Sequence, residues 1–110
     1  MEINTRDVDG IVVVDLGGKL DTQTSGPASE ELTRIAKGDG TRILVNLENV
    51  EFVSSAGLRV LLRLAKTLGA TSGVLKICCA SGVVKEVMEI SGFGTLLDIH
   101  ETEVLALKSF

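Results

Sequence analysis

The sequence predicts an α/β domain in which helices pack on a mixed, mostly parallel β-sheet that begins with a β-hairpin. Short apolar runs typical of buried strands alternate with stretches of helical periodicity, and this alternation favours parallel strand pairing. A length of 110 residues suits one core, so we expect residues 1–110 to form a single domain. An apolar fraction of 45% indicates a packed globule rather than a disordered chain.

The first elements are a predicted hairpin and a helix. Asp9-Gly10 is a favoured two-residue turn that separates strands at residues 2–8 and 11–16, and Gly17-Gly18 is expected to end the second strand. Turn-forming residues at 22–27 precede a helix that Gly38-Asp39-Gly40 should stop. The apolar positions of this helix are Ala28, Leu32, Ile35 and Ala36.

The central elements are two buried strands around an amphipathic helix. Residues 42–47 and 74–79 are nearly continuous apolar runs, as in strands covered on both faces. The helix between them spans residues 58–68. Its apolar positions fall at i, i+3, i+4, i+7 and i+10, and we expect them to form one buried face. They are Leu58, Leu61, Leu62, Ala65 and Leu68.

The last third of the chain predicts a helix, a short strand and a final helix. Ser81 should cap the first helix, and Gly92 should end it. Its expected inward residues are Val83, Val84, Val87, Met88 and Ile90. A brief strand at 96–99 and a helix at 101–108 follow, with the single histidine, His100, in a surface loop between them.

Composition excludes several function classes. The net charge of −4 opposes binding to nucleic-acid phosphates and to anionic membranes. The absence of Trp and Tyr, with only three Phe, argues against base stacking. No apolar run reaches membrane-spanning length, and the N-terminus does not resemble a signal peptide. Cys78 and Cys79 are adjacent, so a bridge between them would be strained, and two buried thiols indicate the reducing cytoplasm.

Two serines occupy the junction between the strand at 42–47 and the helix at 58–68. Unpaired N–H groups in the first turn of a helix favour an oxygen acceptor or an anion there. Ser54 and Ser55 can therefore serve as a helix N-cap, or one of them can carry a phosphate that a partner recognises.

The chain resembles a STAS domain of the anti-sigma-factor-antagonist type over essentially its whole length. Four pieces carry the resemblance in the family's order and spacing. They are Gly18-Lys19-Leu20-Asp21, Asn46-Leu47, the Phe-x-Asp-Ser-Ser/Thr-Gly-Leu motif as Phe52-Val53-Ser54-Ser55-Ala56-Gly57-Leu58, and Ser91-Gly92-Phe93. The chain departs from the motif where Ser54 replaces the aspartate and Ala56 replaces the second hydroxyl.

The resemblance implies a phosphorylation-controlled partner switch. In the family, the unphosphorylated antagonist binds an anti-sigma factor that is also a serine kinase, and this frees a sigma factor. The kinase phosphorylates the serine that corresponds to Ser55, with Ser54 as a rival acceptor here, and a serine phosphatase resets the protein. We expect neither a cofactor nor a metal. The expected partner-binding residues are Asp21, Ser54, Ala56, Gly57, Arg59 and Arg63.

These residues also have ordinary structural interpretations. Asp21 can cap the helix that follows it, whereas the family places its loop beside the phosphoserine. A side chain at Gly57 would crowd the start of the helix. Arg59, Arg63 and Lys66 lie at i, i+4 and i+7, which fits either a solvated face or a docking surface for an acidic partner. Arg59 is also one turn from Ser55 and could pair with a phosphate there.

Two other functions compete with the switch. Catalysis is disfavoured because His100 is the only imidazole, and because neither a nucleophile elbow, a phosphate-binding loop nor a metal-ligand cluster occurs. A constitutive STAS scaffold or regulatory subunit, for example on a lipid-transport ATPase, keeps the fold without the switch, and the missing aspartate favours it. A STAS domain excised from an anion transporter is disfavoured because the chain begins with Met1.

Overall fold

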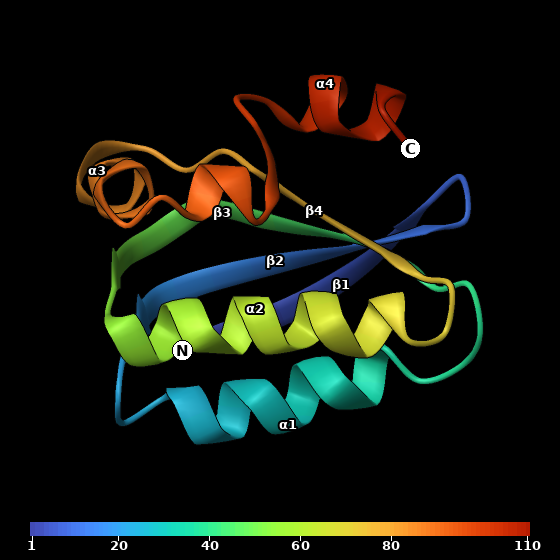
Figure 1. Cartoon of the computed structure of the whole chain (residues 1–110), viewed down its shortest axis with the longest axis horizontal. Coiled ribbons are helices and arrows are strands. Elements are labelled where there is room, and N and C mark those ends of the chain that lie inside the picture. Colours follow the sequence, from blue (N-terminus) through green and yellow to red (C-terminus); the bar gives the residue numbers. More distant parts are fainter.

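One five-stranded sheet organises the computed structural model, which describes residues 1–110 (Figure 1). The strands lie in the order β1-β2-β3-β4-β5; the first pair is antiparallel, and every other pair is parallel. Asp9 and Gly10 join β1 and β2 with positive φ angles of 53° and 81°, as a two-residue hairpin turn requires. The strands are β1 (Glu2–Val8), β2 (Ile11–Leu20), β3 (Arg42–Val53), β4 (Val74–Cys78) and β5 (Asp98–His100).

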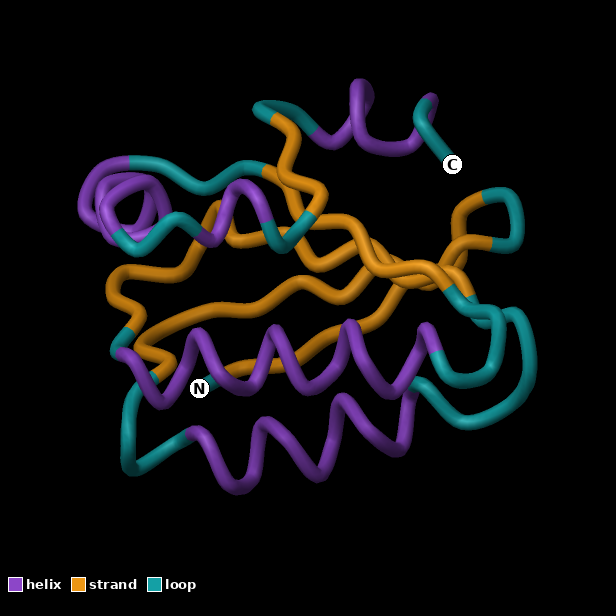
Figure 2. The backbone as a smooth tube through the Cα atoms, in the orientation of Figure 1, coloured by secondary structure: helices purple, strands orange, loops and turns teal.

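The helices alternate with the strands in the predicted order, so the mixed sheet with an N-terminal hairpin is confirmed. They are α1 (Ser25–Ile35), α2 (Ser55–Gly69), α3 (Gly82–Ile90) and α4 (Glu103–Lys108), with a short 3-10 helix, η1 (Phe93–Thr95), before β5. Figure 2 shows α1 and α2 side by side along the sheet, while α4 lies on the opposite side. No helix has both the length and the apolar character to cross a membrane.

Each face of the sheet has its own apolar cluster. The larger cluster joins one face to α1, α2 and α3, through residues such as Leu32, Leu61 and Met88. The smaller cluster, on the other face, lies under α4. Its buried members are Ile11, Val13, Leu44, Cys78 and Ala106.

Two strands are longer than the sequence predicted. β2 does not end at Gly17-Gly18 but continues to Leu20, with register shifts on either side of these glycines, and Gly18 adopts a φ of 96°. β3 does not end at residue 47 but continues to Val53, because buried Val50 and Val53 pair with the extended end of β2. The two extensions bring the end of β2 against the start of α2.

Two helices bury a different face from the one predicted. α2 begins at Ser55 rather than at residue 58, and it buries Val60 and Leu64, whereas Leu62 and Ala65 are only partly buried. α1 packs against α2, so the buried face of α2 is turned partly toward α1. In α3, Val84 and Met88 point inward as predicted and Val87 is partly buried, but Val83 and Ile90 are exposed.

The C-terminal elements start and end a little differently from the prediction. β4 stops at Cys78 because Cys79 adopts a φ of 66°. β5 begins at Asp98 rather than at residue 96, which η1 displaces, and α4 begins at Glu103. His100 lies within β5 and is half-buried, not in a surface loop; its Nε2 is 2.8 Å from the Asp98 carboxylate.

Both thiols are free, as the adjacent positions predicted. Cys78 is buried, and its burial raises the pKa of the thiol well above its ordinary value. Cys79 is only partly buried, so the prediction of two buried thiols is correct for one of them.

Candidate functional site

The candidate site is the turn from β3 into α2. Ser54 is the N-cap of α2, with extended backbone angles of φ −90° and ψ 175°. Its Oγ accepts a hydrogen bond of 3.3 Å from the Gly57 N–H, and its own N–H donates to the Leu20 carbonyl at 2.9 Å. The Ser54 hydroxyl is therefore partly buried and caps the helix. From the sequence, either Ser54 or Ser55 could have been this N-cap.

Ser55 is the first residue of α2 and differs sharply from its neighbour. It is exposed, and its hydroxyl makes no hydrogen bond within the protein. No acidic residue lies in the first turn of α2, so its N–H groups face no carboxylate from that turn. A group attached to the Ser55 oxygen would project into solvent beside the positive end of the helix dipole.

Gly57 sets how closely α2 approaches β2. A Cβ built on Gly57 would lie 2.4 Å from the Leu20 carbonyl oxygen and 2.8 Å from Leu20 Cγ. No such approach is tolerated, so only glycine fits here without a shift of the backbone. The packing requirement inferred from the sequence is present in the structure.

Asp21 follows Leu20 and builds the turn before α1. Its Oδ1 accepts from the N–H groups of Gln23 at 3.0 Å and Thr24 at 3.2 Å. The Asp21 N–H donates to Thr24 Oγ1 at 2.9 Å, and this hydroxyl in turn donates to the Lys19 carbonyl at 2.8 Å. The carboxylate thus stabilises the loop between β2 and α1; the N-cap of α1 is Thr24 rather than Asp21, and no hydrogen bond joins Asp21 to Ser55.

The basic residues of α2 lie on the exposed side of the helix. Ser55, Arg59 and Lys66 share one face because positions separated by four and eleven residues nearly coincide around a helix. No carboxylate lies within ion-pair distance of Arg59, Arg63 or Lys66. Arg59 and Arg63 also line a hollow of about 170 Å³ between α1 and α2, together with Ser25, Gly26, Ser29, Ala56 and Val60.

The structure therefore brings most of the expected site residues to one end of the molecule. Ser54, Ser55, Ala56 and Gly57 form the first turn of α2, and the close contact of Gly57 with Leu20 holds the Asp21 loop beside it. The wall that α1 contributes to the hollow was not predicted. Only its composition, two serines and a glycine within the first five residues of a helix, could have suggested it.

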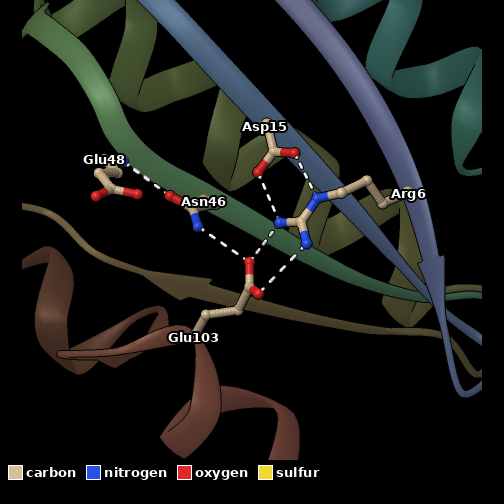
Figure 3. A network of polar contacts seen from close by, with 5 residues as sticks. All are labelled: Arg6, Asp15, Asn46, Glu48 and Glu103. Atoms are coloured by element: carbon tan, nitrogen blue, oxygen red, sulfur yellow. Dashed lines mark hydrogen bonds and ion pairs between the residues drawn. The ribbon is translucent and has the colours of Figure 1, made fainter.

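A second polar cluster, far from this turn, was also not predicted (Figure 3). Arg6 of β1 binds Asp15 of β2 at 2.7 Å and Glu103 of α4 at 2.5 Å. Asn46 Nδ2 donates to the same Glu103 carboxylate at 3.1 Å. These bonds lower the pKa of Glu103 and attach α4 to the sheet. Arg6 and Asp15 are diagonal neighbours in the hairpin register, so that pair could have been found, whereas Glu103 is 97 residues from Arg6.

The fold does not bring the histidine to the serine turn. The only histidine contacts Asp98 and Ser109 in the C-terminal part of the chain. No group of three or more His, Cys, Asp or Glu side chains is placed to hold a metal ion. What the turn offers is an exposed hydroxyl at the first position of a helix.

Comparisons with known proteins identify the family of the chain. The STAS domain family model matches residues 2–106. The anti-sigma-B factor antagonist of Staphylococcus aureus is 37% identical over 106 residues, covering 94% of this chain and 97% of that protein. The anti-sigma F factor antagonist of Paenibacillus polymyxa is 29% identical over 99 residues, covering 89% of this chain and 85% of that protein.

A solved structure shows the same fold. The anti-sigma factor antagonist SpoIIAA in its unphosphorylated form superposes with a TM-score of 0.78 at 26% identity, covering 98% of this chain and 95% of that one. The match to the family spans nearly the whole chain, and these relatives are described as anti-sigma factor antagonists. This chain belongs to the STAS domain family, among the anti-sigma factor antagonists.

Proposed function

We propose that this protein is a phosphorylation-controlled partner switch whose acceptor is Ser55. In its unphosphorylated form it binds an anti-sigma factor that is a serine kinase, and the bound sigma factor is released. The kinase transfers the γ-phosphoryl group of ATP to Ser55 Oγ, leaving ADP and a proton, and the antagonist dissociates. A serine phosphatase hydrolyses the phosphate and restores binding. The protein is a regulator rather than a catalyst, and its free thiols suit the cytoplasm.

The observation that carries this proposal is the contrast between the two serines. Ser55 is exposed and its hydroxyl is unbonded, while the Ser54 hydroxyl accepts from Gly57 N–H and is partly buried. A kinase can reach Ser55 without breaking the helix cap, whereas phosphorylation of Ser54 would displace the cap. The relatives are described as anti-sigma factor antagonists, and the description of SpoIIAA names an unphosphorylated form. Both descriptions support a regulator that is controlled by phosphorylation.

The phosphate would change the surface and leave the fold in place. It adds about −1.5 to −2 charge at neutral pH. That charge would lie at the N-terminal end of α2, where the N–H groups favour an anion, with the exposed Arg59 one turn away. The domain need not rearrange to accept it. A partner that docks over this turn would meet new bulk and charge, and this is a sufficient reason for release.

Intact-mass analysis tests the proposal directly. The protein is incubated with ATP and each candidate anti-sigma kinase of its own organism, with Ser55→Ala and Ser54→Ala in parallel. We expect a gain of one phosphate in the native protein and in Ser54→Ala, and none in Ser55→Ala. Adding the cognate phosphatase should remove the phosphate.

The control variant makes the outcomes distinct. Loss of phosphorylation only in Ser54→Ala would move the acceptor by one residue and contradict the assignment to Ser55. No phosphate with any kinase, together with stable binding to another protein, would replace the switch by a constitutive scaffold, such as a regulatory subunit of a lipid-transport ATPase. Thermal unfolding of each variant confirms that a negative result comes from a folded protein.

A further inference from the structure

Two adjoining hollows lie between α1 and α2, and together they are called the groove here; it begins at Ala56, the residue after Ser55. Its first part is the hollow of about 170 Å³ described above. Its second part continues along the same two helices, and Ser29 and Arg63 line both parts. The further residues of the second part are Glu30, Thr33, Arg34 and Lys37. Figure 1 shows the two helices running in the same direction, with their first turns at the same end of the sheet.

The groove is basic on a protein that is acidic as a whole. Over its 15 residues, α2 carries Arg59, Arg63 and Lys66 and no acidic residue, while the chain has a net charge of −4. On the α1 side, Lys37 has no ion-pair partner, and Arg34 is paired with Glu31 of its own helix. Glu30 is the only other carboxylate on this wall. Glu30 and Glu31 offset only part of the positive charge, so the groove keeps a net positive charge.

The first hollow of the groove is lined mainly by small residues. They are Ser25, Gly26, Ser29 and Ala56, with Val60 beside them, and a Cβ built on Gly26 would meet nothing within 4 Å. Small side chains allow the backbone of another segment to approach closely. The Ser29 hydroxyl makes no hydrogen bond within the protein and can donate, whereas Ser25 Oγ already donates to the Thr22 carbonyl. Basic side chains beside small residues fit an acidic polypeptide segment.

A membrane surface fits this face less well. Large exposed apolar side chains occur at eight positions of the chain, and none of them is in α1 or α2. Amphipathic helices that bind bilayers insert such side chains among the acyl chains. The net negative charge would also oppose an anionic lipid surface. Charge complementarity at this groove therefore favours a protein.

We propose that the groove between α1 and α2 binds an acidic segment of the protein partner, whose carboxylates pair with Arg59 and Arg63. This inference rests on the proposed function in one respect: the partner is the protein whose binding Ser55 controls. A phosphate on Ser55 would draw Arg59, one turn away, out of the groove interaction and place negative charge beside the carboxylates of the segment. The phosphate and the acidic segment thus compete for the same cation.

The test uses synthetic peptides and needs no kinase. The probe is an end-capped 16-residue peptide of Glu and Ala, with Glu at i and i+4 spacing, and its match has every Glu replaced by Gln. Two-dimensional amide NMR follows each titration into the full chain at low salt. We expect shifts confined to α1 and α2 with the Glu peptide, none with the Gln peptide, and weakening as salt is added.

Charge reversals locate the binding. Arg63→Glu should weaken the Glu peptide at least tenfold, whereas the same charge change at exposed Lys108 of α4 should leave it within twofold. Ser55→Asp should weaken the peptide in the native background, and by a smaller factor once Arg59→Ala is present, because only the repulsion between Asp and the carboxylates of the peptide then remains. Shifts outside the groove, or unchanged affinity in Arg63→Glu, would overturn the inference.

Two further outcomes separate this inference from its alternatives. Binding to phosphatidylserine vesicles that is lost in Arg63→Glu, without binding of the Glu peptide, would assign the groove to a membrane and overturn the proposal. Peptide binding in the groove, with no phosphorylation by any kinase, would support the groove and refute the switch. Phosphorylation of Ser55 with no peptide binding would refute the groove and leave the switch standing.

Discussion

Replacing Gly57 with alanine tests whether the serine turn depends on the close approach of α2 to β2. The new Cβ would lie 2.4 Å from the Leu20 carbonyl oxygen, 2.8 Å from Leu20 Cγ and 3.1 Å from the Leu20 carbonyl carbon. Two of these atoms belong to the backbone and cannot rotate away. The same carbonyl accepts the 2.9 Å hydrogen bond from Ser54 N–H, so moving α2 outward would also strain the cap residue.

The expected cost follows from these contacts. Inserting a methyl group into a tightly packed site costs about 1–3 kcal/mol, and a clash with backbone places Gly57→Ala near the upper end of this range. The higher helix propensity of alanine returns about 1 kcal/mol, which leaves a net loss of about 2 kcal/mol. Unfolding entropy of about 2.1 cal/mol/K per residue converts this loss into a thermal midpoint about 8 °C lower.

Gly69 offers a matched control in the same helix. It is the last residue of α2, and a Cβ built there would meet nothing within 4 Å. Gly69→Ala should therefore raise the stability by up to about 1 kcal/mol through helix propensity alone. Thermal unfolding followed by circular dichroism, or by calorimetry, measures both variants. If Gly57→Ala were as stable as Gly69→Ala, the tight contact with Leu20 and the argument built on it would be refuted.

Three other outcomes are expected. Hydrogen bonds from Arg6 lower the pKa of Glu103, so the stabilisation from this carboxylate is present above the ordinary pKa of 4.5 and is lost as the pH falls through the lowered value. Glu103→Gln should cost about 1 kcal/mol at pH 7, and its difference from the native protein in thermal scans should shrink as the pH falls below 4.5. Ser54→Ala removes the N-cap hydrogen bond and should lower the free energy of unfolding by about 1 kcal/mol, whereas Ser55→Ala should be as stable as the native protein. Equal losses of stability in denaturant titrations would contradict the functions assigned to the two hydroxyls. Because burial raises the pKa of Cys78, mass mapping after brief alkylation at pH 8.5 should find Cys79 modified first, and preferential labelling of Cys78 would mean that α4 opens readily.

Local signals in the sequence were sufficient for the order of the elements. The Asp9-Gly10 turn determined the hairpin register, and alternating strand and helix periodicity identified the parallel sheet. The glycines at 17 and 18 misled the prediction because a strand can pass through glycine when a neighbouring strand supplies the hydrogen bonds. That support comes from residues 49–53 of β3, which are distant in sequence from β2.

Burial of individual side chains was harder to predict than the elements that carry them. α3 has apolar residues around much of its circumference, so periodicity alone could not show that Val84 and Met88 would be buried while Ile90 stayed 87% exposed. In α2, the packing of α1 decided that Leu64 rather than Leu62 would be fully buried. Such choices depend on neighbours brought together only by the fold.

The site divides in the same way. The serine pair, Gly57 and the basic residues of α2 could be found in the sequence because they belong to one turn and one helix. The α1 wall of the groove depends on how two helices pack, and Glu103 reaches Arg6 only because α4 folds back over the sheet. Contacts between distant elements carry no local pattern, so the structure was needed to find both.

The replacement of the family's aspartate by Ser54 is explained by the position that this residue occupies. It is the N-cap of α2, and serine and aspartate are both among the strongest N-cap residues, so the bond from Gly57 N–H survives the replacement. What disappears is a negative charge at the start of a helix whose first turn contains no other acid. An acidic group at that place would contribute about 0.3–1 kcal/mol to the unphosphorylated helix. Without it, a phosphate on Ser55 would meet uncompensated N–H groups and no adjacent carboxylate, so the phosphorylated form gains the stabilisation that the unphosphorylated form lacks. The substitution is therefore compatible with the proposed phosphorylation switch, because it removes a charge that would repel a phosphate on Ser55.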